Sequence, residues 1–133
     1  MLYTAVTAAL ILDNDRVLLA QRKSGAQQSL KWEFPGGKLE AGETPEECLA
    51  REIKEELDID IQVKEIFTAV AHSYGDRNIL LLAYLCRRTG GTPSPRDCND
   101  FQWVSLNSLL KYDLAEADLP IAIKLMGERC HHA

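Results

Sequence analysis

The chain has 133 residues, of which 46% are hydrophobic and 26% are charged, a composition typical of one soluble globular domain. The formal net charge of −5 gives no electrostatic reason to bind nucleic acid, and it would repel a polyanionic substrate unless a cation intervened. No apolar stretch is long enough to span a membrane, and no basic segment precedes the first apolar run as in a signal peptide. We therefore expect a single domain over residues 1–133, located in the cytoplasm as a monomer or homodimer, with no nucleic-acid or membrane partner.

The first third of the chain predicts two strands followed by loops. Residues 3–12 are apolar and rich in β-forming residues, an acidic turn follows at residues 13–15, and residues 16–21 form a second apolar run. The polar residues 23–31 and the Phe34-Pro35-Gly36-Gly37 stretch are typical of loops, because glycine and proline interrupt regular structure. We therefore expect a hairpin and then a long connection.

The helix expected from Thr44 to about Leu57 has the strongest local signals. Thr44 suits the N-cap, Pro45 suits the first helical position, and Glu47 completes a capping box. At about 3.6 residues per turn, an apolar stripe faces the core and an acidic face borders it. The stripe contains Leu49, Ala50, Ile53 and Leu57, and the acidic face contains Glu52, Glu55 and Glu56.

The rest of the chain mixes strands with shorter helical segments. The pattern predicts strands over residues 60–71, 77–86 and 101–104, a loop over 88–100, a helical turn over 106–112 and a terminal helix over 118–128. The fold class expected from this order is α+β, with most strands connected antiparallel.

The acidic helix face has two interpretations. It is either a solvated surface, partly compensated by Arg51 and Lys54, or a site for a hard cation such as Mg²⁺, which prefers carboxylate and phosphate oxygens. Gly36 and Gly37 favour the second interpretation, because a backbone without side chains can approach a metal ion or a phosphate closely. A cation would also offset the repulsion between the acids and attract a polyphosphate.

The spacing of these residues resembles the signature of the Nudix hydrolases, G-x5-E-x7-R-E-U-x-E-E-x-G-U, in which U is aliphatic. The matching residues are Gly37, Glu43, Arg51, Glu52, Ile53, Glu55, Glu56 and Ile59. One specified position differs, because Asp58 stands where the family has glycine. That position follows the helix, where a left-handed residue often ends it, and Asp tolerates this conformation at some cost. We expect a small loss of stability and intact chemistry.

The resemblance extends beyond the signature. The stretch WEFPGGKLEAGETPEE is similar to the MutT-type nucleotide-pool enzymes and to the bacterial CTP pyrophosphohydrolases, and the tail YDLAEADLPIA is similar to the second group. The resemblance implies the Nudix fold, a mixed β-sheet between α-helices. It also implies cleavage of a nucleoside triphosphate to the monophosphate and pyrophosphate, with Mg²⁺ as the cofactor and Mn²⁺ as a substitute.

Residue roles follow from the same resemblance. The implied metal ligands are Glu52, Glu55, Glu56 and the backbone carbonyl of Gly37. Arg51 would orient the glutamates, and Glu43 would hold Arg51 or support the ligands from behind. The metal would polarise phosphate oxygens and lower the pKa of a bound water, and Glu55 or Glu56 would accept its proton. Asp97 lies six residues ahead of Trp103, where MutT-type enzymes carry a further acid; it would ligate a metal, help to activate water or serve only as a turn residue.

Three residues are candidates for binding the substrate. Arg22 would bind a phosphate, or it is a solvated strand end. Asp118 matches the position at which MutT-type enzymes carry an asparagine that reads oxidised guanine, or it is the N-cap of the terminal helix. An ionised aspartate only accepts hydrogen bonds, which suits an amino group such as N4 of cytosine or N2 of guanine and favours a cytidine-type or broader specificity. Phe34, like Trp32 and Tyr74, would stack on a base or belong to the core.

Two alternatives to a nucleoside triphosphate pyrophosphohydrolase stay open. ADP-ribose and other nucleoside diphosphate-X pyrophosphatases usually carry more sequence after the signature. Non-catalytic nucleotide-sensing Nudix modules generally carry an added DNA-binding domain and often lack signature acids, which are all present here. The leading hypothesis is hydrolysis of CTP- or dCTP-like nucleotides or of oxidised purines such as 8-oxo-dGTP. The four cysteines are scattered, so neither a disulfide frame nor a zinc site is expected, and His131-His132 is expected to be a tail.

Overall fold

The computed structural model describes residues 2–130, so His131 and His132 lie outside the described residues. The strands are β1 (Thr4–Asp13), β2 (Arg16–Gln21), β3 (Trp32–Glu33), β4 (Asp60–Tyr74), β5 (Arg77–Gly90) and β6 (Asp100–Ser105). The helices are α1 (Pro45–Leu57), α2 (Leu119–Cys130) and two short 3₁₀ helices, η1 (Leu106–Lys111) and η2 (Glu116–Asp118). Within residues 2–130, no helix combines the length and the apolar character needed to cross a membrane.

The strands form one mixed sheet. Its order is β3-β2-β1-β5-β4, and β6 pairs with β2. β1 runs parallel to β5 from Thr4 opposite Ile79 to Ile11 opposite Cys86, whereas the other strand pairs are antiparallel. The antiparallel connections and the mixed sheet that the sequence predicts are therefore confirmed.

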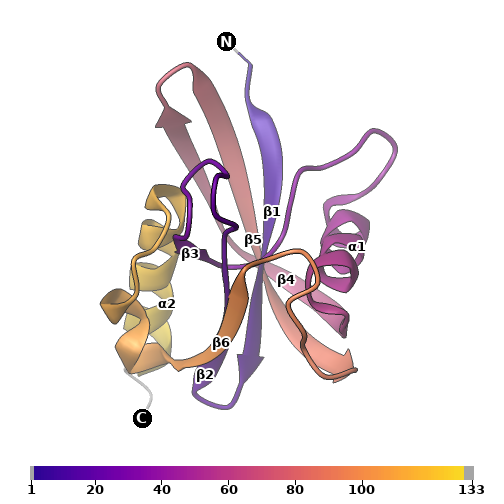
Figure 1. The fold of residues 1–133 in the computed structure, drawn as a ribbon, viewed down its shortest axis with the longest axis vertical. Coiled ribbons are helices and arrows are strands. Elements are labelled where there is room, and N and C mark those ends of the chain that lie inside the picture. Colours follow the sequence, from indigo (N-terminus) through magenta and orange to yellow (C-terminus); the bar gives the residue numbers. More distant parts are fainter. Residues whose placement is uncertain (1, 131–133) are drawn as a thin grey trace.

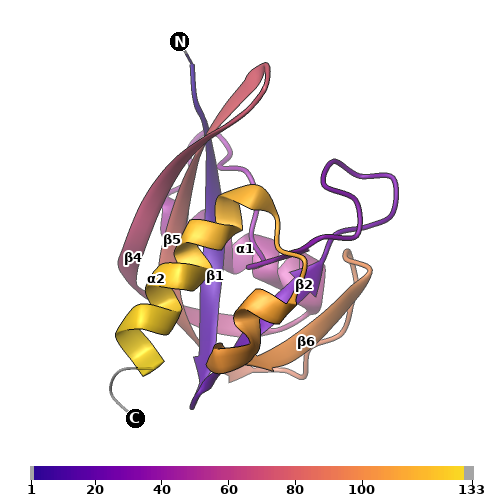
Figure 2. The same ribbon diagram turned by 90° about the vertical axis from the view of Figure 1, so that its left-hand side faces the viewer.

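The two α-helices cover opposite faces of this sheet (Figure 1). Figure 2 shows α2 across the near face, with α1 behind the sheet. Side chains alternate along β1, so that Ala8 and Leu10 join the core that includes α2, whereas Ala9 and Ile11 join the core that includes α1. A strand buried on both faces explains the nearly continuous apolar run in this part of the sequence. The predicted sheet between helices is confirmed.

The start and end of α1 agree with the sequence. The hydroxyl of Thr44 accepts a bond from Glu47 N–H at 3.1 Å, and the Glu47 carboxylate accepts one from Thr44 N–H at 2.9 Å. Asp58 ends the helix in the left-handed conformation, with φ at 57°, and its N–H donates to the carbonyl of Lys54. The buried stripe differs in one position, because Ala50 is exposed and Cys48 is buried.

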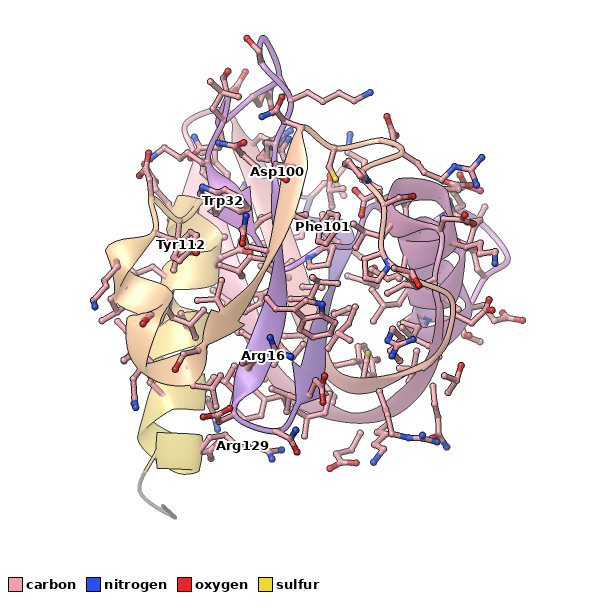
Figure 3. The ribbon with its side chains drawn as sticks, turned by 60° about the horizontal axis from the view of Figure 1, so that its bottom comes forward. Arg16, Trp32, Asp100, Phe101, Tyr112 and Arg129 are labelled. Carbon is pink, nitrogen blue, oxygen red and sulfur yellow. The ribbon has the colours of Figure 1, made fainter. Side chains whose placement is uncertain are left out.

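Other differences from the expected elements occur where distant pairing overrides the local pattern. The predicted loop over residues 88–100 begins too early, since β5 continues to Gly90 by pairing with the start of β4. The sequence did not predict β3, which has only two residues. Trp32 in β3 donates its N–H to the carbonyl of Asp113, and its ring meets Tyr112 edge-on at 5.3 Å (Figure 3). These contacts attach β3 to the segment before α2.

Candidate active site

The glycine segment before α1 lies along β1 like an additional strand. The carbonyl of Pro35 accepts a bond from Ala9 N–H at 2.7 Å, and that of Gly37 accepts one from Thr7 N–H at 2.8 Å. A Cβ atom on Gly36 would lie only 2.0 Å from the carbonyl oxygen of Thr7. Gly36 must therefore be glycine because its backbone packs against the backbone of β1. The sequence alone favours a different reason for the same glycine, which is close approach to a metal ion or a phosphate.

Gly37 contacts the signature helix through its Cα and through its oxygen, which accepts a bond from the Sγ of Cys48 at 3.7 Å. Its carbonyl oxygen accepts bonds from both the N–H and the Oγ1 of Thr7, the latter at 3.0 Å, so both lone pairs are used. A Cβ atom on Gly37 would lie 2.3–2.6 Å from the carboxylate atoms of Glu52. This close approach assigns Gly37 to the positioning of Glu52, and the ligand role of its carbonyl stays a prediction.

Arg51 gathers three signature acids around one guanidinium group. Its Nε and Nη2 donate to the two oxygens of Glu43 at 2.9 and 2.8 Å. Its Nη1 donates to Glu52 at 3.0 Å and, at 3.4 Å, to the more exposed Glu55. The bidentate bond from Arg51 lowers the pKa of Glu43 to about 2, so this carboxylate stays ionised and holds the arginine in place. The expected contact between Glu43 and Arg51 is present.

Glu56 differs from the other signature acids because it faces the interior. Its Oε2 is buried and has no hydrogen-bond partner among the described residues. Burial, together with the carboxylates of Glu33 and Glu52, raises the pKa of Glu56 to about 9, although the backbone N–H of Gly36 opposes this shift. Burial also raises the pKa of Glu52, against the attraction of Arg51.

The described residues do not contain three acidic, histidine or cysteine side chains gathered closely enough to form a ready ligand cluster. Glu52 and Glu55 are drawn to Arg51 instead. The chemistry of the site nevertheless fits a divalent cation, because a buried carboxyl oxygen without a partner, beside other acids, is the environment that such a cation satisfies. The residues that would hold it are Glu52, Glu55 and Glu56.

The loop between β5 and β6 brings Asp97 to the C-terminal end of α1. The N–H groups of Arg96 and Asp97 both donate to the carbonyl of Glu56, at 2.9 and 3.2 Å. The carboxylate of Asp97 pairs with Lys23 from the loop after β2. Asp97 and Glu56 line a cavity of about 160 Å³ together with Cys98. The structure thus places Asp97 beside the signature acids, and its side chain makes an ion pair there.

A second cavity, of about 240 Å³, extends from the glycine segment to the start of α2. Its lining combines apolar residues, basic residues and acids. The apolar part includes Phe34, Ile79, Leu81 and Ala117, the basic part Arg22, Lys38 and Arg77, and the acidic part Glu33, Glu56 and Asp118. Such a mixture suits a ligand that has both an aromatic and a polyanionic part.

Arg22 lines both cavities and is not a solvated strand end. Its Nη1 donates to Glu33 at 2.8 Å, and its Nε donates to the carbonyl of Gln27 at 2.6 Å. Burial raises the pKa of Glu33, and the charge of Arg22 opposes that shift. The pair therefore fixes a charged side chain at the boundary between the two cavities.

Asp118 is buried and reaches across to the glycine segment. Its Oδ2 accepts the backbone N–H of Phe34 at 2.8 Å. Burial and the nearby Glu33 raise the pKa of Asp118 well above its usual range, although the bond from Phe34 opposes this. Asp118 directly precedes α2, which is the position of an N-cap residue. Its Oδ2 nevertheless binds the backbone of Phe34. Phe34 itself is both a core residue and part of the cavity wall.

Sequence reasoning missed several residues of the larger cavity. Glu33, Lys38, Arg77 and Gln28 line it without having been singled out. A signal for Glu33 was present, since an acid between two aromatic residues in a short extended stretch indicates a buried charge. Arg77 and Gln28 carry no local signal, because the fold alone brings the start of β5 and the loop after β2 to the cavity.

The glycine segment, the acidic helix and the mixed sheet define a hydrolase that acts on phosphorus anhydrides. Residues 1–125 match the NUDIX domain, and the chain belongs to the Nudix family, whose members generally use divalent metal ions. The family resemblance, the fold and the enzyme class predicted from the sequence are thereby confirmed. The roles of single residues stay predictions.

Two curated relatives and two solved structures place the chain within the MutT type. It is 35% identical over 113 residues to the 8-oxo-dGTP diphosphatase of Escherichia coli (strain K12), covering 85% of this chain and 88% of that protein. It is 36% identical over 124 residues to the CTP pyrophosphohydrolase of the same organism, covering 93% and 92%. The solution structure of the E. coli ORF135 protein matches with a TM-score of 0.85 and 34% identity, covering 98% and 94%. The MutT NUDIX hydrolase of Burkholderia pseudomallei matches with a TM-score of 0.84 and 25% identity, covering 94% and 99%.

Proposed function

We propose that this chain hydrolyses nucleoside triphosphates to nucleoside monophosphates and pyrophosphate, and that it removes unwanted nucleotides from the cellular pool. The observation that carries the proposal is the unpartnered oxygen of Glu56 in a cavity shared with basic residues and Asp118. Relatives named 8-oxo-dGTP diphosphatase and CTP pyrophosphohydrolase, each aligned over most of both chains, support it.

Mg²⁺ is the proposed cofactor, with Mn²⁺ as a substitute, and Glu52, Glu55 and Glu56 are its proposed ligands. When bound, the cation supplies polarisation of phosphate oxygens and a lower pKa for water. Arg51 donates to Glu52 and Glu55 and so holds their carboxylates together, and Glu55 or Glu56 accepts the proton of the attacking water. Asp97, in the loop between β5 and β6, lies beside Glu56 and is proposed to ligate a metal ion or to help activate the attacking water.

Arg22, Lys38 and Arg77 are proposed to attract the triphosphate. A chain with a net charge of −5 needs local cations to bind a polyanion, and these three line the larger cavity. Arg22 is the best placed of them, because it lines both cavities and its guanidinium is fixed by Glu33 and by the carbonyl of Gln27.

The state of Asp118 changes the expectation about the base. The sequence-based argument took this residue as an ionised acceptor, which favours cytosine. Burial raises the pKa of Asp118 well above its usual range, so its carboxyl takes up a proton more readily than an exposed aspartate, and a protonated carboxyl can donate as well as accept. A group of that kind suits the amino group of cytosine and also the carbonyl of an oxidised guanine, so we propose both nucleotides as substrates.

The test separates the products formed from a nucleotide panel of CTP, dCTP, 8-oxo-dGTP, dGTP and ADP-ribose, with Mg²⁺, with Mn²⁺ and with EDTA. Pyrophosphate and a nucleoside monophosphate report turnover of a triphosphate, and AMP with ribose 5-phosphate reports turnover of ADP-ribose. We expect turnover of CTP or 8-oxo-dGTP that EDTA abolishes. Glu55→Gln should lower kcat by about a hundredfold, whereas Glu46→Gln, an exposed acid in the first turn of the same helix, should leave kcat unchanged. Turnover of ADP-ribose alone would favour the alternative activity, and absence of turnover on the whole panel would contradict the proposal.

A further inference from the structure

Gln28 is a polar residue of the larger cavity for which the proposed catalytic machinery has no role. It lies in the loop between β2 and β3 and lines the cavity together with Arg22 and Glu33. Its Oε1 is buried and has no hydrogen-bond partner among residues 2–130. An unpaired buried amide oxygen destabilises the folded protein, so native structures rarely keep one without a function.

The loop holds Gln28 in place with backbone conformations that are themselves unfavourable. Gln28 and Leu30 both have left-handed dihedral angles, with φ at 56° and 59°, although neither is glycine. The carbonyl of Gln28 accepts the N–H of Lys31 at 3.1 Å, and that of Gln27 accepts the Nε of Arg22. Arg22 therefore holds the loop at the residue next to Gln28, and its bond to Glu33 connects the loop to β3 in the cavity wall.

The chemistry of the free atom limits what it can bind. Oε1 of an amide is an acceptor, so its partner must be a hydrogen-bond donor. Phosphate oxygens are acceptors and do not match it, and Arg22 directs its Nε to Gln27 and its Nη1 to Glu33. Within a cytidine nucleotide, the suitable donors are the ribose hydroxyl groups and the exocyclic amino group of the base.

We propose that Oε1 of Gln28 accepts a hydrogen bond from the nucleoside part of the substrate, and that Gln28 is a specificity-determining residue. That the ligand is a nucleotide rests on the proposed function. The unpaired Oε1 and the cavity around it are features of the structure and do not depend on that function. Oε1 has no partner among residues 2–130 of the free protein. A hydrogen bond from the substrate would therefore contribute more to binding than one that only replaces a hydrogen bond already made within the protein.

The test uses Gln28→Met, which keeps the length of the side chain and removes the acceptor, with Gln27→Met as the matched control. Gln27 is the exposed neighbour in the same loop. Calorimetric titration with a non-hydrolysable α,β-methylene analogue of CTP in the presence of Mg²⁺ measures Kd. We expect Gln28→Met to raise Kd about tenfold, and Gln27→Met to leave it unchanged. The Tm of Gln28→Met should not fall, because the substitution removes an unpaired buried polar atom.

The source of the donor is found by repeating the titration with the corresponding 2′,3′-dideoxy and uridine analogues. If a ribose hydroxyl is the donor, the difference between the ribose and dideoxy analogues shrinks in Gln28→Met. If the amino group of the base is the donor, the difference between the cytidine and uridine analogues shrinks instead. An unchanged Kd in Gln28→Met, or a rise equal for all three analogues, would contradict the inference.

The inference and the proposed function fail separately. A wild-type protein that turns over nucleotides but shows no effect of Gln28→Met would remove the role of Gln28 and keep the enzyme. A wild-type protein that binds the analogues through Gln28 but releases no pyrophosphate would remove the proposed activity and keep the role of Gln28.

Discussion

Glu56 and Asp118 are acids that the fold buries, and no basic side chain of residues 2–130 forms an ion pair with either carboxyl group. Each has a pKa raised chiefly by burial, and one oxygen of Glu56 lacks a partner among the described residues. Gln28 adds a third buried polar group to the wall of the larger cavity. Local rules of stability are broken at these residues, which is the expected pattern for a site that completes its bonds with a ligand.

Glu56→Gln keeps the shape of the side chain and removes its ability to bind a cation strongly. We expect kcat/KM to fall by about a hundredfold or more, because a metal ligand is lost. The free energy of unfolding in EDTA should change by less than about 1 kcal/mol, since the buried group loses no hydrogen bond of its Oε2. Steady-state kinetics and urea denaturation measure the two quantities. Normal activity in this variant would exclude Glu56 as a ligand.

Asp118→Asn keeps an oxygen for the N–H of Phe34 and replaces the other carboxyl oxygen by an amide NH₂ group, which only donates. We expect the ratio of kcat/KM for 8-oxo-dGTP to that for CTP to rise by about tenfold, in proportion to one hydrogen bond. Asp113→Asn, an exposed acid of the same segment that pairs with Lys31, is the control. A ratio that stays the same in Asp118→Asn would show that this side chain does not contact the base.

At the scale of elements, the C-terminal end of α1 joins the signature helix to the loop that carries Asp97. Besides the two bonds to the carbonyl of Glu56, the carbonyl of Leu57 accepts the N–H of Ser94 at 3.0 Å. Asp58, the one departure from the signature, makes an ion pair with Arg96 of the same loop at 3.1 Å. The side chain that replaces the usual glycine thus adds a contact to the loop that carries Asp97.

Asp58→Gly should be nearly neutral, because two effects oppose each other. Glycine relieves the left-handed strain by about 1 kcal/mol, and loss of the exposed ion pair with Arg96 costs at most about 1 kcal/mol. Asp58→Ala loses the pair and keeps the strain, so we expect it to be about 1 kcal/mol less stable than Asp58→Gly. Urea denaturation measures the difference. Equal stability of the two variants would show that the left-handed conformation is not the cause of the cost.

The elements predicted best from the sequence are those whose signals are local. The capping box at Thr44 and the spacing of the acids lie within α1 itself, and the structure agrees with them. The exposure of Ala50 and the burial of Cys48 were not predictable from helix periodicity, because Cys48 faces the glycine segment, where its Sγ lies 3.3 Å from the carbonyl of Lys38. The contact of Asp118 with Phe34 joins residues 84 positions apart, so no local pattern reports it.

At the scale of the whole molecule, both cores share β1, and the glycine segment pairs with the same strand. A substitution in either core can therefore move the site. Thr7 illustrates this connection, because its N–H and Oγ1 hold Gly37, and Gly37 in turn contacts the carboxylate of Glu52. The position of the Glu52 carboxylate thus depends on the packing of β1, because the glycine segment lies between that strand and Glu52.

Ligands should stabilise the folded protein measurably. A nucleotide analogue at one hundred times its Kd, with Mg²⁺, adds about 2.7 kcal/mol to the free energy of unfolding. For a domain of this size we expect a rise in Tm of about 8 °C. Differential scanning calorimetry measures it, with EDTA as the control that should remove most of the rise. An equal rise with and without EDTA would mean that nucleotide binding does not use the metal ion.

The parallel pairing of β1 with β5 also determines when the site can form during synthesis. Thr4 lies opposite Ile79, so the first strand must wait for a partner that the ribosome adds some 75 residues later. Such non-local contacts close large loops and raise the contact order, which slows folding. A nascent chain that ends after α1 already carries the complete signature but lacks the strand that completes the sheet beside β1. The signature becomes a working site only late in synthesis, after β5 has left the ribosome.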